Sequence, residues 1–137
     1  MKKKSKTHRR YHLFDCRKFI LGRMSAKIAF ILQGKHKCDY TPNLDRGDFA
    51  VVINSDNLKV TGRKMDDKIY YSFSGYPGGI TSANLKKLCE EDSRRVITSA
   101  VYGMLPKNKL RDKMMKRLLV FRDKEHNLKV KIEEVKP

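Results

Sequence analysis

The residues that could carry catalysis are few, and their spacing fits no known catalytic pattern. The four histidines, His8, His12, His36 and His126, show neither an HExxH motif nor another recognised spacing of metal ligands. The sequence has no GxSxG motif, and none of its three cysteines sits in a recognisable nucleophile context. It therefore favours a protein that is not an enzyme, with no catalytic residues, no metal site and no cofactor.

Two acidic residues could still bind a metal ion, and the cysteines could still form a disulfide or bind zinc. Asp45 and Asp48 flank Gly47 and could pair around a metal, although acids in such a turn more often lead into a strand. The cysteines are odd in number and widely spaced, which predicts neither a disulfide framework nor a zinc site. We interpret them as small buried hydrophobic residues in a reducing compartment. They are Cys16, Cys38 and Cys89.

A glycine-rich segment at residues 75–79, GYPGG, suggests a phosphate-binding loop, but its spacing does not support that function. It matches neither GxxxxGK[ST] nor GxGxxG. Gly78 and Gly79 could let the backbone approach an RNA phosphate closely, because glycine has no Cβ. A tight turn that requires a positive φ explains the same residues equally well.

The net charge points to a polyanionic partner. The 137 residues include 32 Lys and Arg against 15 Asp and Glu, which gives a net charge of +17. Self-repulsion of this size opposes compaction unless a polyanion neutralises it, and nucleic acid is the usual partner. An anionic membrane surface is the alternative, but the chain has no apolar window of about 18 residues and no Trp to anchor at a membrane interface.

The most basic segment follows an apolar helix that Gly103 and Pro106 are expected to end. On a helix over residues 109–119, the 100° step places Leu110, Met114 and Leu118 on one face. The opposite face is basic, and only Asp112 offers an opposite charge nearby. A merely solubilising face is one interpretation, and an elbow that packs on a sheet and turns its cations toward RNA is the other. The cations of that face are Lys109, Lys113, Lys116 and Arg117.

Two further clusters combine cations with aromatic or polar residues. Residues 34–40, GKHKCDY, suit folded RNA, because cations neutralise phosphates and planar rings stack on unpaired bases. Tyr40 could equally be packed inside the protein. The other cluster, Arg63, Lys64 and Lys68, is diluted by Asp66 and Asp67.

Strand and helix patterns alternate along the chain, which predicts an α/β domain with helices on both faces of a sheet. The expected strands are 11–16, 49–53, 58–61, 69–73 and 118–121. The expected helices are one around residues 24–33 that ends at Gly34, one from Thr81 onward, one capped by Ser93, and 109–119. We expect a basic arm at 1–10 that is disordered or ordered by RNA, a domain at 11–122, and an irregular charged tail at 123–137.

Three blocks that occur in order resemble the universal large-subunit ribosomal proteins of the thirteenth family, in their bacterial form. They read GKHKCDYTPNLDRGDFAVVIN, VTGRKMDDKIYY and VYGMLPKNKL. The resemblance extends from about Phe14 to Phe121, which is most of the chain. Several blocks in the correct order are far more specific than any one motif.

The resemblance implies a three-layer α/β/α fold with a small, mostly parallel four-stranded sheet. It also implies a structural constituent of the large ribosomal subunit that binds and stabilises folded rRNA, beside neighbouring ribosomal proteins. Neither a membrane nor a small-molecule substrate is expected, and the ribosome would be in a bacterial cytoplasm or in an organelle of bacterial descent. An RNA-processing or RNA-modifying enzyme of α/β fold is the alternative, but it needs a cofactor loop or catalytic residues that the sequence does not show.

This chain departs from the family pattern in three places. Ser72, Phe73 and Ser74 stand where bacterial members often have a histidine. Arg111 and Asp112 replace a usual Gly-Arg pair, and the sequence after His126 is replaced by NLKVKIEEVKP. A histidine-mediated contact at residues 72–74 is therefore not expected, and the contacts made by the family's C-terminal ending are not transferred to this chain.

Charge, clusters and resemblance together predict one set of RNA-binding residues. In the arm and the first cluster these are Lys3, Lys4, Arg9, Arg10, Lys35, His36, Lys37 and Tyr40. In the middle of the chain they are Arg63, Lys64, Lys68, Tyr71, Ser74, Gly75, Tyr76, Gly78 and Gly79. Around the elbow they are Lys107, Asn108, Lys109, Arg111, Lys113, Lys116 and Arg117.

Overall fold

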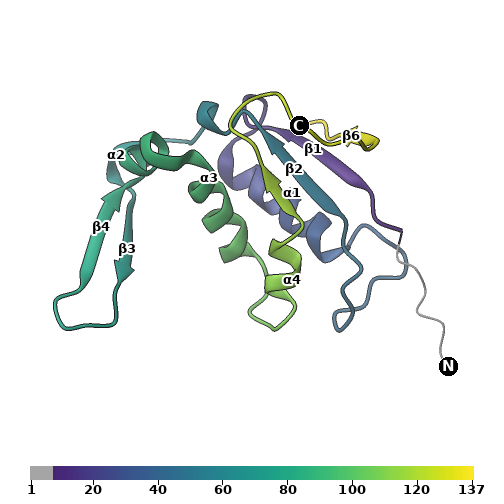
Figure 1. Cartoon of the computed structure of the whole chain (residues 1–137), viewed down its shortest axis with the longest axis horizontal. Coiled ribbons are helices and arrows are strands. Elements are labelled where there is room, and N and C mark those ends of the chain that lie inside the picture. Colours follow the sequence, from purple (N-terminus) through teal and green to yellow (C-terminus); the bar gives the residue numbers. More distant parts are fainter. Residues whose placement is uncertain (1–7) are drawn as a thin grey trace.

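The computed structural model describes residues 8–137, which form a mixed α/β fold (Figure 1). Its strands are β1 (Tyr11–Asp15), β2 (Phe49–Ile53), β3 (Ile69–Phe73), β4 (Ile80–Asn84), β5 (Leu118–Val120) and β6 (Ile132–Glu134). Its helices are α1 (Leu21–Gln33), α2 (Lys64–Asp67), α3 (Leu85–Met104) and α4 (Arg111–Met115), with a 3-10 turn η1 (Ser55–Asn57). The α/β class predicted from the sequence is confirmed.

The central sheet has four parallel strands in the order β5-β2-β1-β6. Phe14 lies opposite Val52 across the β1–β2 pair, and Val51 lies opposite Leu119 across the β2–β5 pair. Residues 50–53 of β2 are all buried, which is the expected environment of a continuous β-branched run inside a parallel sheet. The prediction of a small parallel four-stranded sheet is therefore confirmed.

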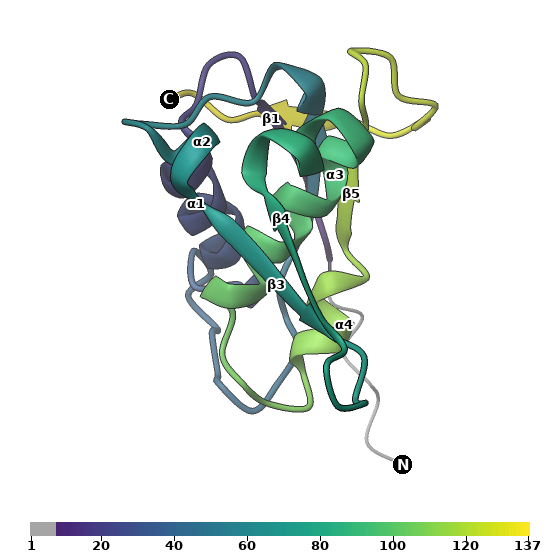
Figure 2. The same cartoon turned by 90° about the vertical axis from the view of Figure 1, so that its left-hand side faces the viewer.

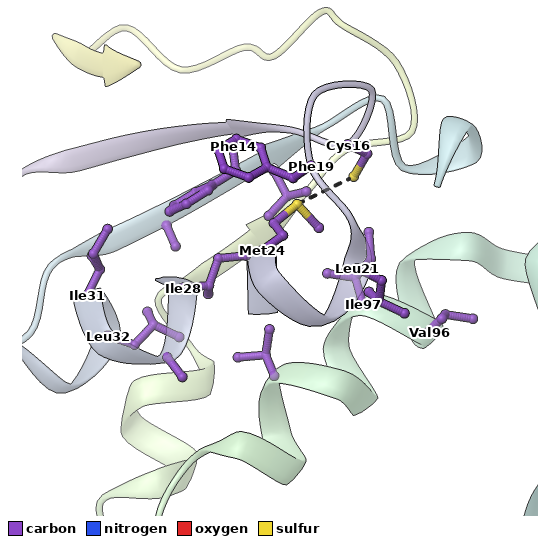
Figure 3. Packing of buried hydrophobic residues seen from close by; sticks show 14 of the residues in the cluster. Phe14, Cys16, Phe19, Leu21, Met24, Ile28, Ile31, Leu32, Val96 and Ile97 are labelled. Carbon is purple, nitrogen blue, oxygen red and sulfur yellow. Dashed lines mark hydrogen bonds between the residues drawn. The ribbon is translucent and has the colours of Figure 1, made fainter. Parts of the chain in front are cut away.

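The helices are distributed differently from the three layers expected from the sequence. Helices α1 and α3 pack directly against each other, and α4 contacts both. Figure 3 shows these helices on one side of the sheet, while the non-helical chain between β5 and β6 passes over the other side. Both crossovers, from β1 to β2 and from β2 to β5, step toward the same edge, so right-handed connections place their helices on the same face.

Helix α1 supplies the centre of the hydrophobic core (Figure 3). Met24, Ile28 and Leu32 are fully buried, as their helical spacing predicts. Gly34 ends the helix at φ 80°, and its N–H donates to the Ile31 carbonyl at 3.0 Å. Burial raises the pKa of the Cys16 thiol to about 12, so this cysteine acts as a small hydrophobic residue, as expected. The same prediction is wrong for Cys38, which is exposed, and Cys89 is only half-buried.

Three local predictions were wrong, because pairing partners distant in the sequence decided the conformation. The tail at 123–137 is not wholly irregular, since β6 pairs with β1 and forms the fourth strand of the sheet. The expected strand at 58–61 is reduced to a single bridge between Ile20 and Lys59. Residues 80–84 form β4 rather than the start of a helix, because they pair with β3.

Two helices also differ from prediction at their ends. Helix α3 begins at Leu85 and is interrupted at Asp92, whose backbone is extended (φ −158°, ψ 96°). The Asp92 side chain accepts a hydrogen bond from the Arg94 N–H at 3.2 Å, so Asp92 rather than Ser93 acts as the cap. Helix α4 covers only 111–115 of the expected 109–119, because the chain turns into β5 after Lys116.

Strands β3 and β4 form an antiparallel hairpin that projects away from the sheet beside α3 (Figures 1 and 2). Its tip is the GYPGG segment, where Gly75 and Gly78 have φ of 87° and 72°. These positive φ values confirm that the segment is a tight turn. Within residues 8–137, no helix is both long enough and apolar enough to cross a membrane.

Candidate nucleic-acid interface

The loop between α3 and α4 presents exposed lysines on a fixed backbone. The Asn108 side chain accepts hydrogen bonds from the N–H groups of Leu110 and Arg111, both at 3.1 Å, and so orders the entry to α4. Lys107 and Lys109 flank it and are exposed. Lys113 and Lys116 add two exposed cations, and none of the four lysines forms a salt bridge within residues 8–137. The expected basic elbow is therefore present.

Arg111 and Arg117, by contrast, point into the protein rather than toward a partner. Arg111 is buried, lies 4.3 Å above the Tyr102 ring and donates to the Pro106 carbonyl. Arg117 is only 3% exposed and donates to the Asp45 carboxylate at 2.5 Å. Because α4 ends early, residue 117 falls in the turn before β5 and faces inward. The structure therefore removes both arginines from the set of predicted RNA-facing cations.

Arg117 closes a network around the loop that precedes β2. Its guanidinium also donates to the Leu32 carbonyl at 2.8 Å and to the Asp48 carbonyl at 3.3 Å. Arg9 reaches the same Asp45 carboxylate at 3.4 Å. This network joins the end of α1 to the strand β2, so its arginines have a structural role.

A second buried carboxylate, Asp48, gathers three side chains from different segments. Lys37 Nζ lies 2.5 Å from Oδ1, and the Nε2 atoms of His12 and His36 lie 3.2 and 2.8 Å from Oδ2. Burial alone would raise the pKa of Asp48, but the hydrogen bonds from Lys37, His12 and His36 outweigh it and hold the pKa at about 2. Lys37 and His36, predicted as RNA contacts, are thus partly engaged inside the protein.

The donor atoms of His12, His36 and Asp48 lie within 4.8 Å of one another, which is close enough for a transition-metal ion. The Lys37 ammonium already neutralises the carboxylate, however, and a divalent cation beside it would be repelled. We therefore interpret these residues as a structural network. His12 could not be assigned to it from the sequence, because it is 36 residues from Asp48.

We expect this network to make the stability of the protein sensitive to acid. The pKa of Asp48 is about 2 in the folded protein against 3.8 ordinarily, so its stabilisation is complete above pH 4 and is lost between pH 4 and 2. We estimate its contribution at about 2 kcal/mol. Urea denaturation at several pH values should show a stability gap between the wild type and Asp48→Asn that closes over this range. A gap that stays constant would contradict the assignment.

The remaining predicted cations of the described residues lie at the surface. Arg10 is exposed and pairs with Glu133 at 3.7 Å. Lys35 is exposed, and Tyr40 is half-buried. Arg63, Lys64 and Lys68 are exposed around α2, at the base of the hairpin. Lys3 and Lys4 lie outside the described residues.

The hairpin carries the predicted uncharged contacts. Tyr71 and Tyr76 are 71% and 75% exposed, and Ser74, Gly75 and Gly78 are exposed around the tip. Gly79 is half-buried, and a Cβ there would lie 2.9 Å from the Tyr76 carbonyl oxygen, so the turn leaves little room for a side chain. No residue from Ile69 to Asn84 is charged. Any contact that this hairpin makes therefore depends on rings, hydroxyls and backbone rather than on charge.

The structure also places two exposed cations that the sequence analysis missed beside the hairpin. Lys87 and Arg95 on α3 face β3 and β4 across a hollow that they line together. In sequence they looked like the polar face of an ordinary helix, and no local pattern distinguished them. Only the position of the hairpin makes them a cluster.

The fold and the surface together define the class of this protein, which is a small, strongly basic α/β protein. Its exposed cations lie on an ordered loop and around a projecting hairpin. Comparison with known families gives the same class. Residues 9–127 match the sequence model of the family Ribosomal protein L13, and the chain belongs to that family. The family resemblance drawn from the three sequence blocks is confirmed.

Individual relatives support this assignment over most of their length. The chain is 48% identical over 126 residues to the large ribosomal subunit protein uL13 of Caldanaerobacter subterraneus subsp. tengcongensis, which covers 92% of this chain and 88% of the relative. It is 44% identical to the protein of the same name from Thermotoga maritima, over 92% of this chain and 85% of the relative. For the Lachnoclostridium phytofermentans protein of that name the identity is 47%, over 87% and 83%. These relatives are named as ribosomal proteins rather than enzymes, in agreement with the prediction.

Proposed function

We propose that this chain is a structural constituent of the large ribosomal subunit and that it binds and stabilises folded large-subunit rRNA. Its family and the names of its relatives support the assignment to the large subunit. Its partners are then rRNA and neighbouring ribosomal proteins, and its place in the cell is the ribosome. The proposed mechanism is neutralisation of phosphates by surface Lys and Arg.

The observation that carries the proposal is the basic elbow. Lys107, Lys109 and Lys113 are exposed, lie on or next to the short helix α4, whose entry is ordered by Asn108, and form no salt bridge within the described part of the chain. Lysines that only solubilise a surface are normally interspersed with acids, and here Asp112 alone is nearby. Such a surface fits a phosphate backbone, because each contact releases counterions from the RNA.

The second group of proposed phosphate contacts surrounds the base of the hairpin. Arg63, Lys64 and Lys68 are exposed there, and Lys68 Nζ lies 5.1 Å above the Tyr70 ring. Tyr71 and the tip of the hairpin extend this surface without adding charge. An rRNA segment would then meet cations at the base and aromatic or backbone groups toward the tip.

Replacing Lys107, Lys109 and Lys113 with Gln is expected to weaken binding to large-subunit rRNA about 100-fold at 0.1 M salt. The slope of log K against log salt should fall in magnitude by about 2–3, because each lost phosphate contact removes about 0.7–0.9. Filter binding across a salt series measures both quantities. The wild-type chain should also stay with the large-subunit peak of a sucrose gradient after a high-salt wash.

A matched triple variant distinguishes binding by the elbow surface from binding that depends only on the total charge. Lys124, Lys129 and Lys131 lie in the tail and are exposed, and replacing them with Gln removes the same three positive charges as the elbow variant does. This control should change the slope by much less than the elbow variant. Equal losses in both variants would show that net charge, rather than the elbow, drives binding.

A further inference from the structure

A cleft opens between the inner face of the hairpin and helix α3. Its volume is about 440 Å³, within the range of ~300–1,000 Å³ typical of ligand pockets. Tyr70, Ser72 and Thr81 line it from the hairpin, and Lys87, Arg95 and Ser99 line it from α3. Figures 1 and 2 both show the hairpin standing beside α3 rather than lying flat on the sheet.

The two walls of the cleft differ in chemistry as the two parts of a nucleotide do, the uncharged base and the charged phosphate. The hairpin wall offers a ring and hydroxyl groups and has no charge. The α3 wall offers Lys87 and Arg95, neither of which forms a salt bridge with any residue from 8 to 137, and one acid, Glu91. The apolar residues Leu88 and Val96 of α3 also line the cleft. One side therefore suits a base and the other suits phosphates.

Tyr70, which lines the cleft, carries a polar atom that the described part of the protein leaves unsatisfied. Its hydroxyl oxygen is buried and has no hydrogen-bond partner within residues 8–137. A buried polar atom without a partner is costly, and it is usually satisfied by an ordered molecule or a ligand. Tyr70 also lines a second hollow of about 310 Å³ that contains Lys64 and Lys68, so cations lie on both sides of it.

We propose that this cleft binds an unpaired, extended segment of RNA. A base enters against Tyr70 and the apolar side chains, and the adjoining phosphates lie toward Lys87 and Arg95. Paired and stacked bases of an A-form helix do not fit a hollow of this shape, whereas splayed bases do. The identity of the ligand as RNA rests on the proposed function, and the assignment of this cleft and these residues goes beyond it.

The test uses the full chain and a fluorescein-labelled ten-nucleotide oligouridylate, with a blunt RNA duplex of equal length as comparison. Lys87→Gln with Arg95→Gln is expected to weaken oligouridylate binding about 10–30-fold at 0.1 M salt and to lower the salt slope by about 1.4. Duplex binding should change by less than threefold. The matched control is Lys86→Gln with Lys129→Gln, two exposed lysines that do not line the cleft, and it should change neither.

Tyr70→Phe removes only the buried hydroxyl and is not expected to disturb the fold. It should weaken oligouridylate binding about threefold without changing the salt slope, because a neutral hydrogen bond is lost. The proposal is overturned if the cleft variant behaves like its control, if the duplex loses as much affinity, or if free uridine monophosphate competes as well as the oligonucleotide. Binding of large-subunit rRNA and its loss in the elbow variant are measured separately, so failure here leaves the proposed function standing.

Discussion

Replacing Arg117 with Met is expected to lower the free energy of unfolding by about 3–5 kcal/mol. The guanidinium is 3% exposed and bridges Asp45, the Leu32 carbonyl and the Asp48 carbonyl. Methionine fills similar space but leaves two carbonyl oxygens without this donor, and it leaves the Asp45 carboxylate with only the longer contact from Arg9 at 3.4 Å. Urea denaturation followed by circular dichroism measures the loss.

Two companion variants identify the cause of that loss. Arg117→Lys keeps the charge but cannot donate to three acceptors in one plane, so we expect it to recover only part of the stability. Adding Asp45→Asn to Arg117→Met removes the carboxylate charge that has lost its shorter ion pair and should also recover part of the loss. If Arg117→Met costs less than about 1 kcal/mol, the guanidinium is solvated and belongs with the surface cations after all.

Gly47→Ala is expected to destabilise the protein by about 4 kcal/mol or more, or to prevent folding. A Cβ at this position would lie 1.7 Å from the Leu32 carbonyl oxygen and 2.8 Å from Arg117 Nη2. The first of these atoms is backbone at the end of α1, so the clash cannot be relieved by a side-chain rotation. Either α1 or the loop before β2 must move, which also separates Arg117 from Leu32. The yield of soluble protein and its thermal midpoint measure the effect.

Gly103→Ala is the matched control for that substitution. Gly103 lies inside α3, and nothing is within 4 Å of the position that its Cβ would occupy. Alanine should therefore stabilise the helix by up to about 1 kcal/mol. If the two variants were equally stable, the close approach at Gly47 would not exist in solution.

Arg117→Met and Gly47→Ala should also affect the candidate interface. Both disturb the network that holds the segment carrying Lys35, His36 and Lys37. The Asp48 N–H donates to the Ile31 carbonyl, and Lys37 donates to the Arg46 carbonyl at 3.0 Å. Loosening this region would therefore alter the position of the first basic cluster as well as the stability. The elbow lysines, which are ordered by Asn108, would not be affected directly.

The sequence by itself determined the elements whose signal is local. The continuous β-branched run at 49–53 gave a strand with the observed bounds, and the spacing of Met24, Ile28 and Leu32 gave the buried face of α1. Glycine, whose preference for positive φ is a property of the single residue, gave the end of α1 and the tip of the hairpin. The family resemblance rested on contiguous blocks in order, and it was confirmed for the same reason.

Only the tertiary structure decided which distant groups meet. The fourth strand came from the tail, and the helices gathered on one face, because strand order and crossover direction are properties of the whole sheet. Lysine and arginine obey the same local pattern whether they face solvent or a buried carboxylate. The inward position of Arg117, the contacts of His12 and Lys37 with Asp48, and the placement of Lys87 and Arg95 beside the hairpin therefore had no local signal. A charged side chain takes its role from its partner, and for a pair as distant in the sequence as Arg117 and Asp45 only the fold brings the two together.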